Sequence, residues 1–157
     1  MHLTFRPMTE ADFPQAEAMK RATVLAATGD ATLFDQWFTP ERPLESHLKK
    51  LLAFDPASCV FAVLDNAIIG HIHLMIVEKG TCGYLNDIYL MAEHRGQSLG
   101  EQLHAYALTF FRKHGVSRAL LRTNPHNPKL IAFYQRMGWT LGASSTHGLV
   151  WMERTLE

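Results

Sequence analysis

Apolar and polar residues alternate over His2–Pro7 and then change to a helical spacing, so a strand followed by a helix is predicted. Thr9 and Asp12 are spaced as a capping box, which favours a helix that opens there and runs through Phe13, Ala16 and Met19. A second amphipathic helix is predicted from leucines that recur at helical spacing after Pro43, and it ends near Asp55-Pro56.

The middle of the chain is rich in Val, Ile and Phe, which favours strands. Cys59–Leu64 and Ile68–Glu78 flank an Asp-Asn pair that is typical of a tight hairpin, and Gly83–Leu90 is predicted as the next strand. Gly29–Pro40, which lies between the two helices, has no regular period and is expected to be irregular.

The second half of the chain alternates between helices and strands. An apolar stripe predicts a helix over Gly96–His114, and a helix over Asn127–Gly138 is indicated by the Asn-Pro pair at its start. Arg118–Arg122 is predicted as a short strand between them. Two strands near Trp139–Leu141 and Leu149–Leu156 close the chain.

The element order is therefore strand, two helices, three strands, helix, strand, helix and two strands. It predicts a mixed α/β (α+β) fold with a mostly antiparallel sheet of about seven strands, flanked by about four helices on its two faces. The 157 residues suffice for one sizeable core, and no linker or repeat divides them. We expect a single domain over residues 1–157.

Charge and hydropathy narrow the classes of partner. Lys and Arg together number 15, as do Asp and Glu, so no net charge draws the chain onto nucleic acid or anionic lipid. Apolar runs such as Ile72–Val77 are too short to span a bilayer, and no leader pattern opens the sequence. Cys59 and Cys82 lack the spacing of zinc or disulfide frameworks. We expect a cytoplasmic protein without nucleic-acid or membrane partners.

A tight turn after the strand that ends at Leu90 has the composition of an anion-binding turn. Arg95–Gly100 reads Arg-Gly-Gln-Ser-Leu-Gly and leads into the long helix. The first N–H groups of a helix lack partners, its dipole is positive there, and glycine permits close backbone approach. This arrangement favours a pyrophosphate, although such turns also occur as plain packing connections.

Four segments share their residues with one enzyme family. Tyr84–Leu90, Arg95–Gly100, Asn127–Tyr134 and Gly138-Trp139 together resemble the GNAT superfamily of N-acetyltransferases. Its turn usually reads Arg/Gln-x-x-Gly-x-Gly/Ala, and its later helix reads Asn-x-x-Ala-x-x-Phe-Tyr-x-x-x-Gly-Phe. The element order matches that family over nearly the whole chain.

Four positions depart from the family pattern. Ser98 stands where the family most often has glycine, so a Cβ lies close to the expected phosphates, although its hydroxyl could donate to a phosphate oxygen. Asn86 stands where many relatives have a glutamate. Ala132 lies later than the usual spacing, and Trp139 replaces phenylalanine.

The resemblance implies acetyl-coenzyme A as the co-substrate. Backbone groups of two strand residues would pair with the amide-rich pantetheine arm like an added strand, and amides of the turn would hold the pyrophosphate. The expected cofactor-binding residues are Ile88, Leu90, Arg95, Gly96, Gln97, Ser98, Leu99, Gly100 and Asn127.

Acyl transfer to an amine needs a proton donor for the thiolate, an oxyanion donor and a proton acceptor. Tyr134 holds the family's general-acid position, with aromatic packing beside Phe133 as the alternative role. A backbone N–H near Leu90 would serve the oxyanion. Tyr134 and Asp87 are the expected catalytic residues.

The proton acceptor is the least defined of these roles, because the amide of Asn86 cannot take a proton from an ammonium group. Asp87 is the nearest carboxylate, although strand alternation places it on the face opposite Asn86. Glu93 and His73 are other acceptors. Asp87 is explained equally well as a strand carboxylate paired with a surface cation.

His71 and His73 project from one face of a strand, a spacing that suits a metal ion, but the sequence shows no third ligand. We expect no metal, and instead solvent-facing or hydrogen-bonded histidines that line an acceptor pocket. Trp37 and Phe38 lie in the segment that overhangs the acceptor site in similar proteins, with core packing as the alternative for at least one. The expected substrate contacts are Trp37, Phe38, His73 and Asn86.

The favoured function is transfer of an acetyl group to a primary amine of a small molecule, an amino acid or a peptide, by direct attack in a ternary complex. Ser98 and the missing glutamate leave open a catalytically weak relative that binds coenzyme A as a sensor or regulatory module. If the chain were a purely structural or interaction domain, the turn at Arg95–Gly100 and the helix that begins at Asn127 would both be coincidental. Pairing of edge strands near the C-terminus would give a homodimer.

Overall fold

The computed structural model describes residues 1–156 and contains one seven-stranded sheet with the strand order β1-β2-β3-β4-β5-β7-β6. Every neighbouring pair is antiparallel except β4 and β5, which run parallel. The predicted mixed, mostly antiparallel sheet is therefore confirmed. The strands are β1 (Thr4–Pro7), β2 (Cys59–Leu64), β3 (Ala67–Val77), β4 (Cys82–Leu90), β5 (Arg118–Thr123), β6 (Thr140–Ser144) and β7 (Val150–Thr155).

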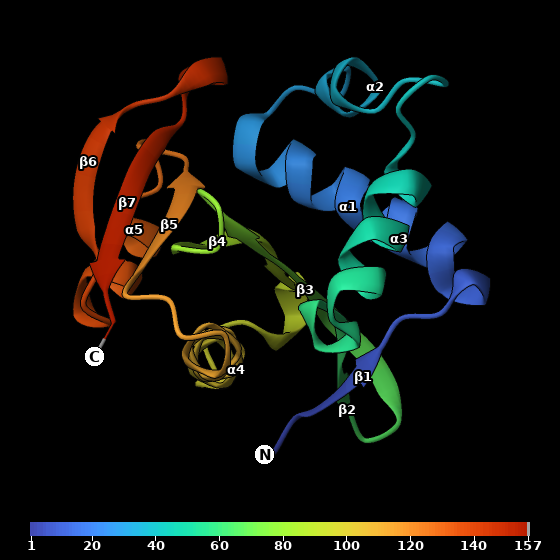
Figure 1. Cartoon of the computed structure of the whole chain (residues 1–157), viewed down its shortest axis with the longest axis horizontal. Coiled ribbons are helices and arrows are strands. Elements are labelled where there is room, and N and C mark those ends of the chain that lie inside the picture. The colour runs from blue at the N-terminus through green and yellow to red at the C-terminus, as the bar shows by residue number, and fades with distance from the viewer. Residues whose placement is uncertain (157) are drawn as a thin grey trace.

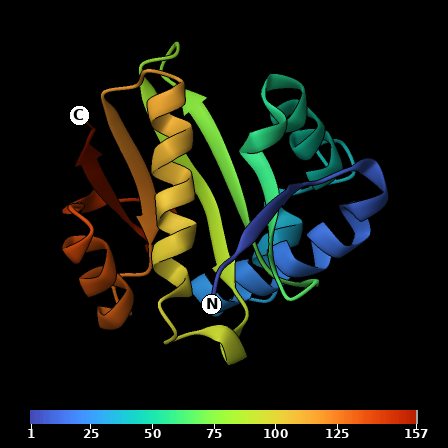
Figure 2. The same ribbon diagram turned by 90° about the horizontal axis from the view of Figure 1, so that it is seen from below.

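Helices cover both faces of the sheet. α1 (Phe13–Thr28) and α3 (Leu44–Phe54) pack with the short α2 (Leu33–Trp37) on one face, over a core that includes Phe61. α4 (Leu99–Lys113) and α5 (Pro128–Arg136) pack on the other face, over a core that includes Ile72 and Leu121. Figure 1 shows α1, α2 and α3 gathered on one side, and β5, β6 and β7 on the other. Figure 2 shows α4 crossing the opposite face of the sheet.

Two predicted boundaries are corrected. Gly29–Pro40 is not wholly irregular, because it contains α2, whose five residues are too few to reveal a helical period in the sequence. The long helix begins at Leu99 rather than Gly96, since Gly96 (φ 77°) and Ser98 (φ 62°) both adopt left-handed backbone conformations that a right-handed helix cannot include.

Several local predictions are confirmed. Asp65 (φ 49°) and Asn66 (φ 66°) form the two-residue hairpin turn between β2 and β3. The Asn127 side chain caps α5 by accepting a hydrogen bond of 3.2 Å from the backbone N–H of Leu130.

None of the helices within residues 1–156 combines the length and the apolar character that a membrane crossing needs.

Two irregularities of β4 define where the sheet opens. β4 pairs with β5 only from Cys82 to Leu85, and its remaining residues continue without β5 beside them. The pairing with β3 also shifts, because His73 faces Asp87 whereas the next residue, Leu74, faces Leu85. Asn86 is therefore the extra residue of a β-bulge at the point where β4 and β5 separate.

Candidate functional site

The free edge of β4 is the first component of the site. The Met91 N–H donates to the Ile69 carbonyl on β3 at 2.8 Å. Backbone groups of an antiparallel strand alternate in direction, so those of Ile88 and Leu90 point away from β3, toward the side that β5 has left. These two residues offer an extended ligand a row of backbone partners.

The turn into α4 lies at the end of that edge. The Arg95 Nε donates to the Leu90 carbonyl at 2.8 Å, and its guanidinium lies 5.6 Å from the centre of the Tyr89 ring. Arg95, Gly96, Gln97 and Ser98 are exposed. The last two predicted turn residues are less accessible. The Leu99 side chain is buried in the core, and Gly100 is half-buried. Leu99 can therefore contact a ligand only through its backbone.

Tyr134 lies in the interior, in the core that α4 and α5 cover. Its side chain is 4% exposed, and its ring packs against Phe133 and Trp139. Burial raises the pKa of the hydroxyl far above its ordinary value, and the negative charge of Asp87 adds to the increase. Tyr134 therefore stays protonated at neutral pH, as a proton donor must.

Asn86 and Asp87 contradict the predicted alternation, because both side chains meet helices on the same face. The Asn86 Nδ2 lies 3.4 Å from the His47 Nε2 on α3, and an Asp87 oxygen lies 3.2 Å from the Lys20 Nζ on α1. The bulge at Asn86 interrupts the two-residue alternation, so the side chains of Asn86 and Asp87 lie on the same face of the sheet. Asp87 is paired with a cation, as the alternative interpretation held, but the cation is buried.

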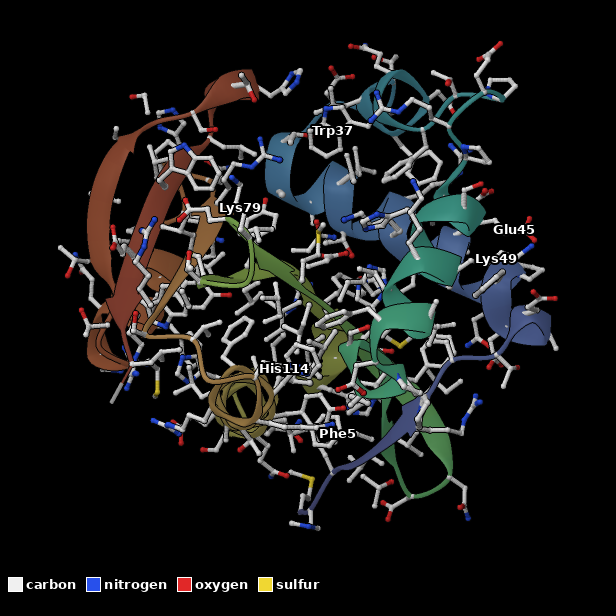
Figure 3. All side chains as sticks on the ribbon, viewed as in Figure 1. Phe5, Trp37, Glu45, Lys49, Lys79 and His114 are labelled. Atoms are coloured by element: carbon white, nitrogen blue, oxygen red, sulfur yellow. The ribbon has the colours of Figure 1, made fainter. Side chains whose placement is uncertain are left out.

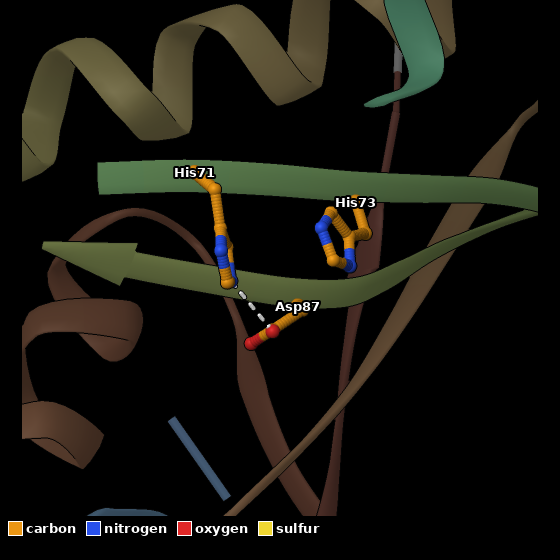
Figure 4. A group of neighbouring side chains, drawn as sticks. All are labelled: His71, His73 and Asp87. Atoms are coloured by element: carbon orange, nitrogen blue, oxygen red, sulfur yellow. Dashed lines mark hydrogen bonds and ion pairs between the residues drawn. The ribbon is translucent and has the colours of Figure 1, made fainter. Parts of the chain in front are cut away.

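Lys20, His71, His73 and Asp87 form a buried polar cluster between α1 and the sheet. The His71 Nε2 lies 2.7 Å from the Asp87 Oδ2, and the two histidine rings stack at 4.4 Å (Figure 4). Both histidines have no exposed surface, so the solvent-facing alternative is wrong, whereas His71 is hydrogen-bonded, as the other alternative held. His73 is accordingly not placed to touch an acceptor directly, and neither of its ring nitrogens has a hydrogen-bond partner within residues 1–156.

The cluster also changes the chemistry expected of Asp87. Burial alone would raise the pKa of this carboxyl, but the Lys20 ammonium and His71 outweigh it and hold the pKa far below the usual range. Such a carboxylate is a weak proton acceptor. Burial and the neighbouring His71 lower the pKa of His73, which keeps that ring neutral.

The structure brings Asp87 beside His71 and His73 as a third group that can bind a metal, which the sequence did not reveal. One ligand atom each from His71, His73 and Asp87 lies within 4.8 Å of the others. However, the Lys20 ammonium already occupies the carboxylate side of the cluster at 3.2 Å. A divalent cation there would face a buried like charge, so the donor set fits an ammonium ion better than a metal.

His47 is a residue that sequence reasoning missed, since a single histidine on an amphipathic helix carries no signal of its neighbours. Its ring lies beside Asn86 and is 6.3 Å from the Phe38 ring. Burial, together with the charges of Lys20 and Lys50, lowers the pKa of His47 to about 4. His47 is therefore neutral at physiological pH and, like Asp87, holds a proton only weakly.

Trp37 and Phe38 have different surroundings. Phe38 packs 4.9 Å from the Phe34 ring, within the core beneath α1–α3, as the packing alternative held. The Trp37 Nε1 donates to the His147 Nε2 at 3.1 Å, and Figure 3 shows Trp37 on the side of α1 and α2 that faces β7. His147 lies in the turn between β6 and β7. This contact bridges the two halves of the molecule.

A second set of residues, also unpredicted, surrounds Arg122 on β5. The Arg122 Nε donates to the Tyr84 hydroxyl at 3.1 Å, and its Nη1 donates to the Thr146 Oγ1 at 3.1 Å. Its guanidinium lies 6.0 Å from the Trp37 ring and 5.6 Å from the Trp151 ring. We call Trp37, Tyr84, Arg122, Thr146, His147 and Trp151 the Arg122 cluster.

Comparisons with known proteins give one family match and several similar structures. The family model described as Acetyltransferase (GNAT) family matches residues 27–139. No curated protein sequence matches the chain. Ard1 from Thermoplasma volcanium has a similar structure, with 15% identity, a TM-score of 0.75 and coverage of 100% of this chain and 99% of that one.

Two further structures are similar, and both hold ligands. YncA from Salmonella typhimurium, a putative acetyltransferase with its cofactor acetyl-CoA, has 16% identity, a TM-score of 0.73 and coverage of 100% of this chain and 95% of that one. Naa50 from Arabidopsis thaliana, in complex with the bisubstrate analogue CoA-Ac-MVNAL, has 14% identity, a TM-score of 0.69 and coverage of 98% and 99%. At these identities the likeness shows the fold.

Proposed function

Because the chain belongs to the acetyltransferase (GNAT) family, we propose that it transfers an acetyl group from acetyl-CoA to a primary amine of a small molecule, an amino acid or a peptide. The observation that carries the proposal is the free edge of β4 beyond Leu85, which ends beside the exposed turn into α4. The acetyl-CoA of YncA and the CoA-peptide analogue of Naa50 support both halves of the reaction.

The free edge and the turn suit the two parts of coenzyme A. The outward-pointing backbone groups of Ile88 and Leu90 would pair with the amides of pantetheine as an added strand. The N–H groups of Gln97–Gly100 would hold the pyrophosphate, and the exposed Arg95 would add a charge-assisted contact. Asn127 would contribute indirectly, because its side chain is engaged in capping α5.

The chemistry uses direct attack of a neutral amine on the thioester carbonyl. The C–N bond forms and the C–S bond breaks, while a backbone N–H near Leu90, on the free edge, would stabilise the oxyanion. Tyr134 would donate its proton to the departing thiolate. The neutral His47 beside Asn86 would pass the amine's surplus proton on to solvent rather than keep it, and Asp87 would act through Lys20 and His71 rather than as the direct acceptor.

Binding is tested by the melting temperature with and without acetyl-CoA. At about 100 times the dissociation constant, a ligand that binds only the folded chain stabilises it by about 2.7 kcal/mol, which raises the melting temperature by about 5 to 10 °C. Desulfo-coenzyme A should give a similar shift, because the pantetheine and pyrophosphate contacts remain. No shift at saturating acetyl-CoA would contradict the proposal.

Catalysis is tested by replacing Tyr134→Phe. The variant should keep the acetyl-CoA shift and lose about 100-fold or more of its kcat, because one proton donor is removed. Tyr106→Phe is the control, since the Tyr106 hydroxyl donates only to the Ala57 carbonyl at 2.7 Å, away from the opening. A normal shift without turnover of any amine by the wild-type protein would instead favour a coenzyme A sensor.

A further inference from the structure

Arg122 differs from the other arginine on its strand in having no anionic partner. Arg118, four residues earlier, lies 2.6 Å from the Glu78 carboxylate and 3.1 Å from the Glu153 carboxylate. Within residues 1–156 no carboxylate lies within 4 Å of Arg122, whose partners are the hydroxyls of Tyr84 and Thr146. One half-buried positive charge on β5 is thus left without a counter-ion.

The side chain is nevertheless held in place. Two hydroxyl oxygens accept from it, and two indole rings lie within about 6 Å of its guanidinium. A guanidinium has five N–H donors, and the Nη2 group has no partner in the described part of the chain. A fixed guanidinium with free donors loses little side-chain entropy when it binds an anion.

Arg122 lies at the point where β5 separates from β4. Leu121 is the last β5 residue paired with β4, opposite Leu85, so Arg122 and Asn86 are the first residues on either side of the opening. Arg122 pairs with Trp151 in register and shares its face with Tyr84, which lies opposite Leu120. This is the face of α1–α3, whereas the pyrophosphate turn leads into α4 on the other face. The free charge therefore lies on the side of the opening opposite the expected coenzyme A phosphates.

We propose that Arg122 binds a carboxylate of the acceptor, so that the favoured substrates are primary amines that carry a carboxylate, such as free amino acids. This inference rests on the proposed acetyl transfer and specifies its acceptor class. The planar fork of the guanidinium matches a carboxylate, and a single positive charge balances a carboxylate better than a phosphate dianion. Polycationic amines are disfavoured, because they would bring like charge to Arg122.

The experiment measures acetyl transfer by thiol release with matched acceptors. A panel of amino acids is compared with the corresponding amino acid amides, with aminoalkyl phosphates and with polyamines. We expect kcat/KM for the amino acids to exceed that for the amides by about 10- to 100-fold, the range of a charged hydrogen-bonded contact. Arg122→Gln should remove this difference mainly through KM, and Arg122→Lys should keep part of it. Arg118→Gln is the control and should leave the ratio unchanged.

Each other outcome has a distinct meaning. Equal use of amino acids and amides, a preference for polyamines or phosphates, or an unchanged ratio in Arg122→Gln would overturn the carboxylate assignment while leaving acetyl transfer intact. If acetyl-CoA binds but no amine in the panel is acetylated, the proposed function fails and this inference fails with it. A melting temperature measured for each variant with acetyl-CoA shows that the coenzyme site is still formed.

Discussion

Lys20 on α1 and Asp87 on β4 form an ion pair of 3.2 Å in which both side chains are less than a tenth exposed. Asp87 also lies 2.7 Å from the ring of His71, so one carboxylate joins the helix layer to two adjacent strands. A buried charge is costly unless it is paired, and each partner therefore depends on the other. The pair fixes the position of β4 directly beside the bulge at Asn86.

Breaking this pair should strongly destabilise the protein. We expect Asp87→Asn to lower the free energy of unfolding by about 3 to 5 kcal/mol, because it leaves the Lys20 ammonium buried without a counter-ion. Lys49→Met, which removes exposed ion pairs with Glu45 and Glu10, should change the free energy of unfolding little, because solvent screens these charges. Urea unfolding followed by circular dichroism measures both. Equal small losses would show that Lys20 reaches water when its partner is removed.

The general architecture could be predicted from the sequence because it depends on local periods. The strands and long helices follow the spacing of apolar residues, and the turn at Asp65 and the cap at Asn127 follow from the conformational preferences of their own residues. The start of α4 could not be placed, because its first predicted residues include Ser98, whose left-handed conformation is imposed by the turn rather than by its own preference.

The site was only partly predictable, for a different reason. The cofactor segment is contiguous, so a motif could indicate it, whereas the polar cluster joins residues from α1, β3 and β4. Lys20 carries no signal that it will be buried, and the bulge that turns Asp87 toward it is visible only in the strand register. The Arg122 cluster likewise depends on the contact of Trp37 with His147, which lies 110 residues later.

Acid should lower the free energy of unfolding because of His104. The Trp139 Nε1 donates to the His104 Nε2 at 2.8 Å, and an indole nitrogen can only donate, so this imidazole must be neutral. Burial and the charges of Arg154 and Arg112 lower the pKa of His104 to about 4, against about 6.5 in an unfolded chain. Between these values the unfolded state binds more protons, so the free energy of unfolding should fall as the pH drops from 6.5 to 4.

Urea unfolding at pH 7.5, 6 and 5 measures this pH dependence. His104→Gln offers the indole a neutral acceptor that does not titrate, and it should flatten the pH dependence by the share that His104 contributes. His126→Gln, at an exposed position, is the control and should leave the slope unchanged. A slope that is the same in His104→Gln and in the wild-type protein would assign the acid sensitivity to other groups.

The left-handed conformation of Ser98 predicts a stabilising substitution. A residue with a Cβ at φ 62° is strained by about 1 kcal/mol relative to glycine, and the Ser98 side chain makes no capping hydrogen bond in return. Ser98→Gly should therefore raise the melting temperature by about 2 to 4 °C and leave acetyl-CoA binding intact or stronger. Ser145→Gly, at φ −117°, is the control and should bring no gain. Loss of acetyl-CoA binding in Ser98→Gly would instead show that the hydroxyl contacts a phosphate.

Adding zinc tests whether the buried polar cluster of Lys20, His71, His73 and Asp87 holds the Lys20 ammonium or a metal ion. Because Lys20 already neutralises Asp87, neither zinc nor EDTA should change the melting temperature of the wild-type protein. Lys20→Met removes the ammonium and leaves two imidazoles and one carboxylate with ligand atoms within 4.8 Å, so zinc should stabilise this variant. Adding His73→Ala to Lys20→Met should abolish that gain. A zinc-dependent rise in the melting temperature of the wild-type protein would show that the metal displaces the ammonium, and that the cluster is a metal site.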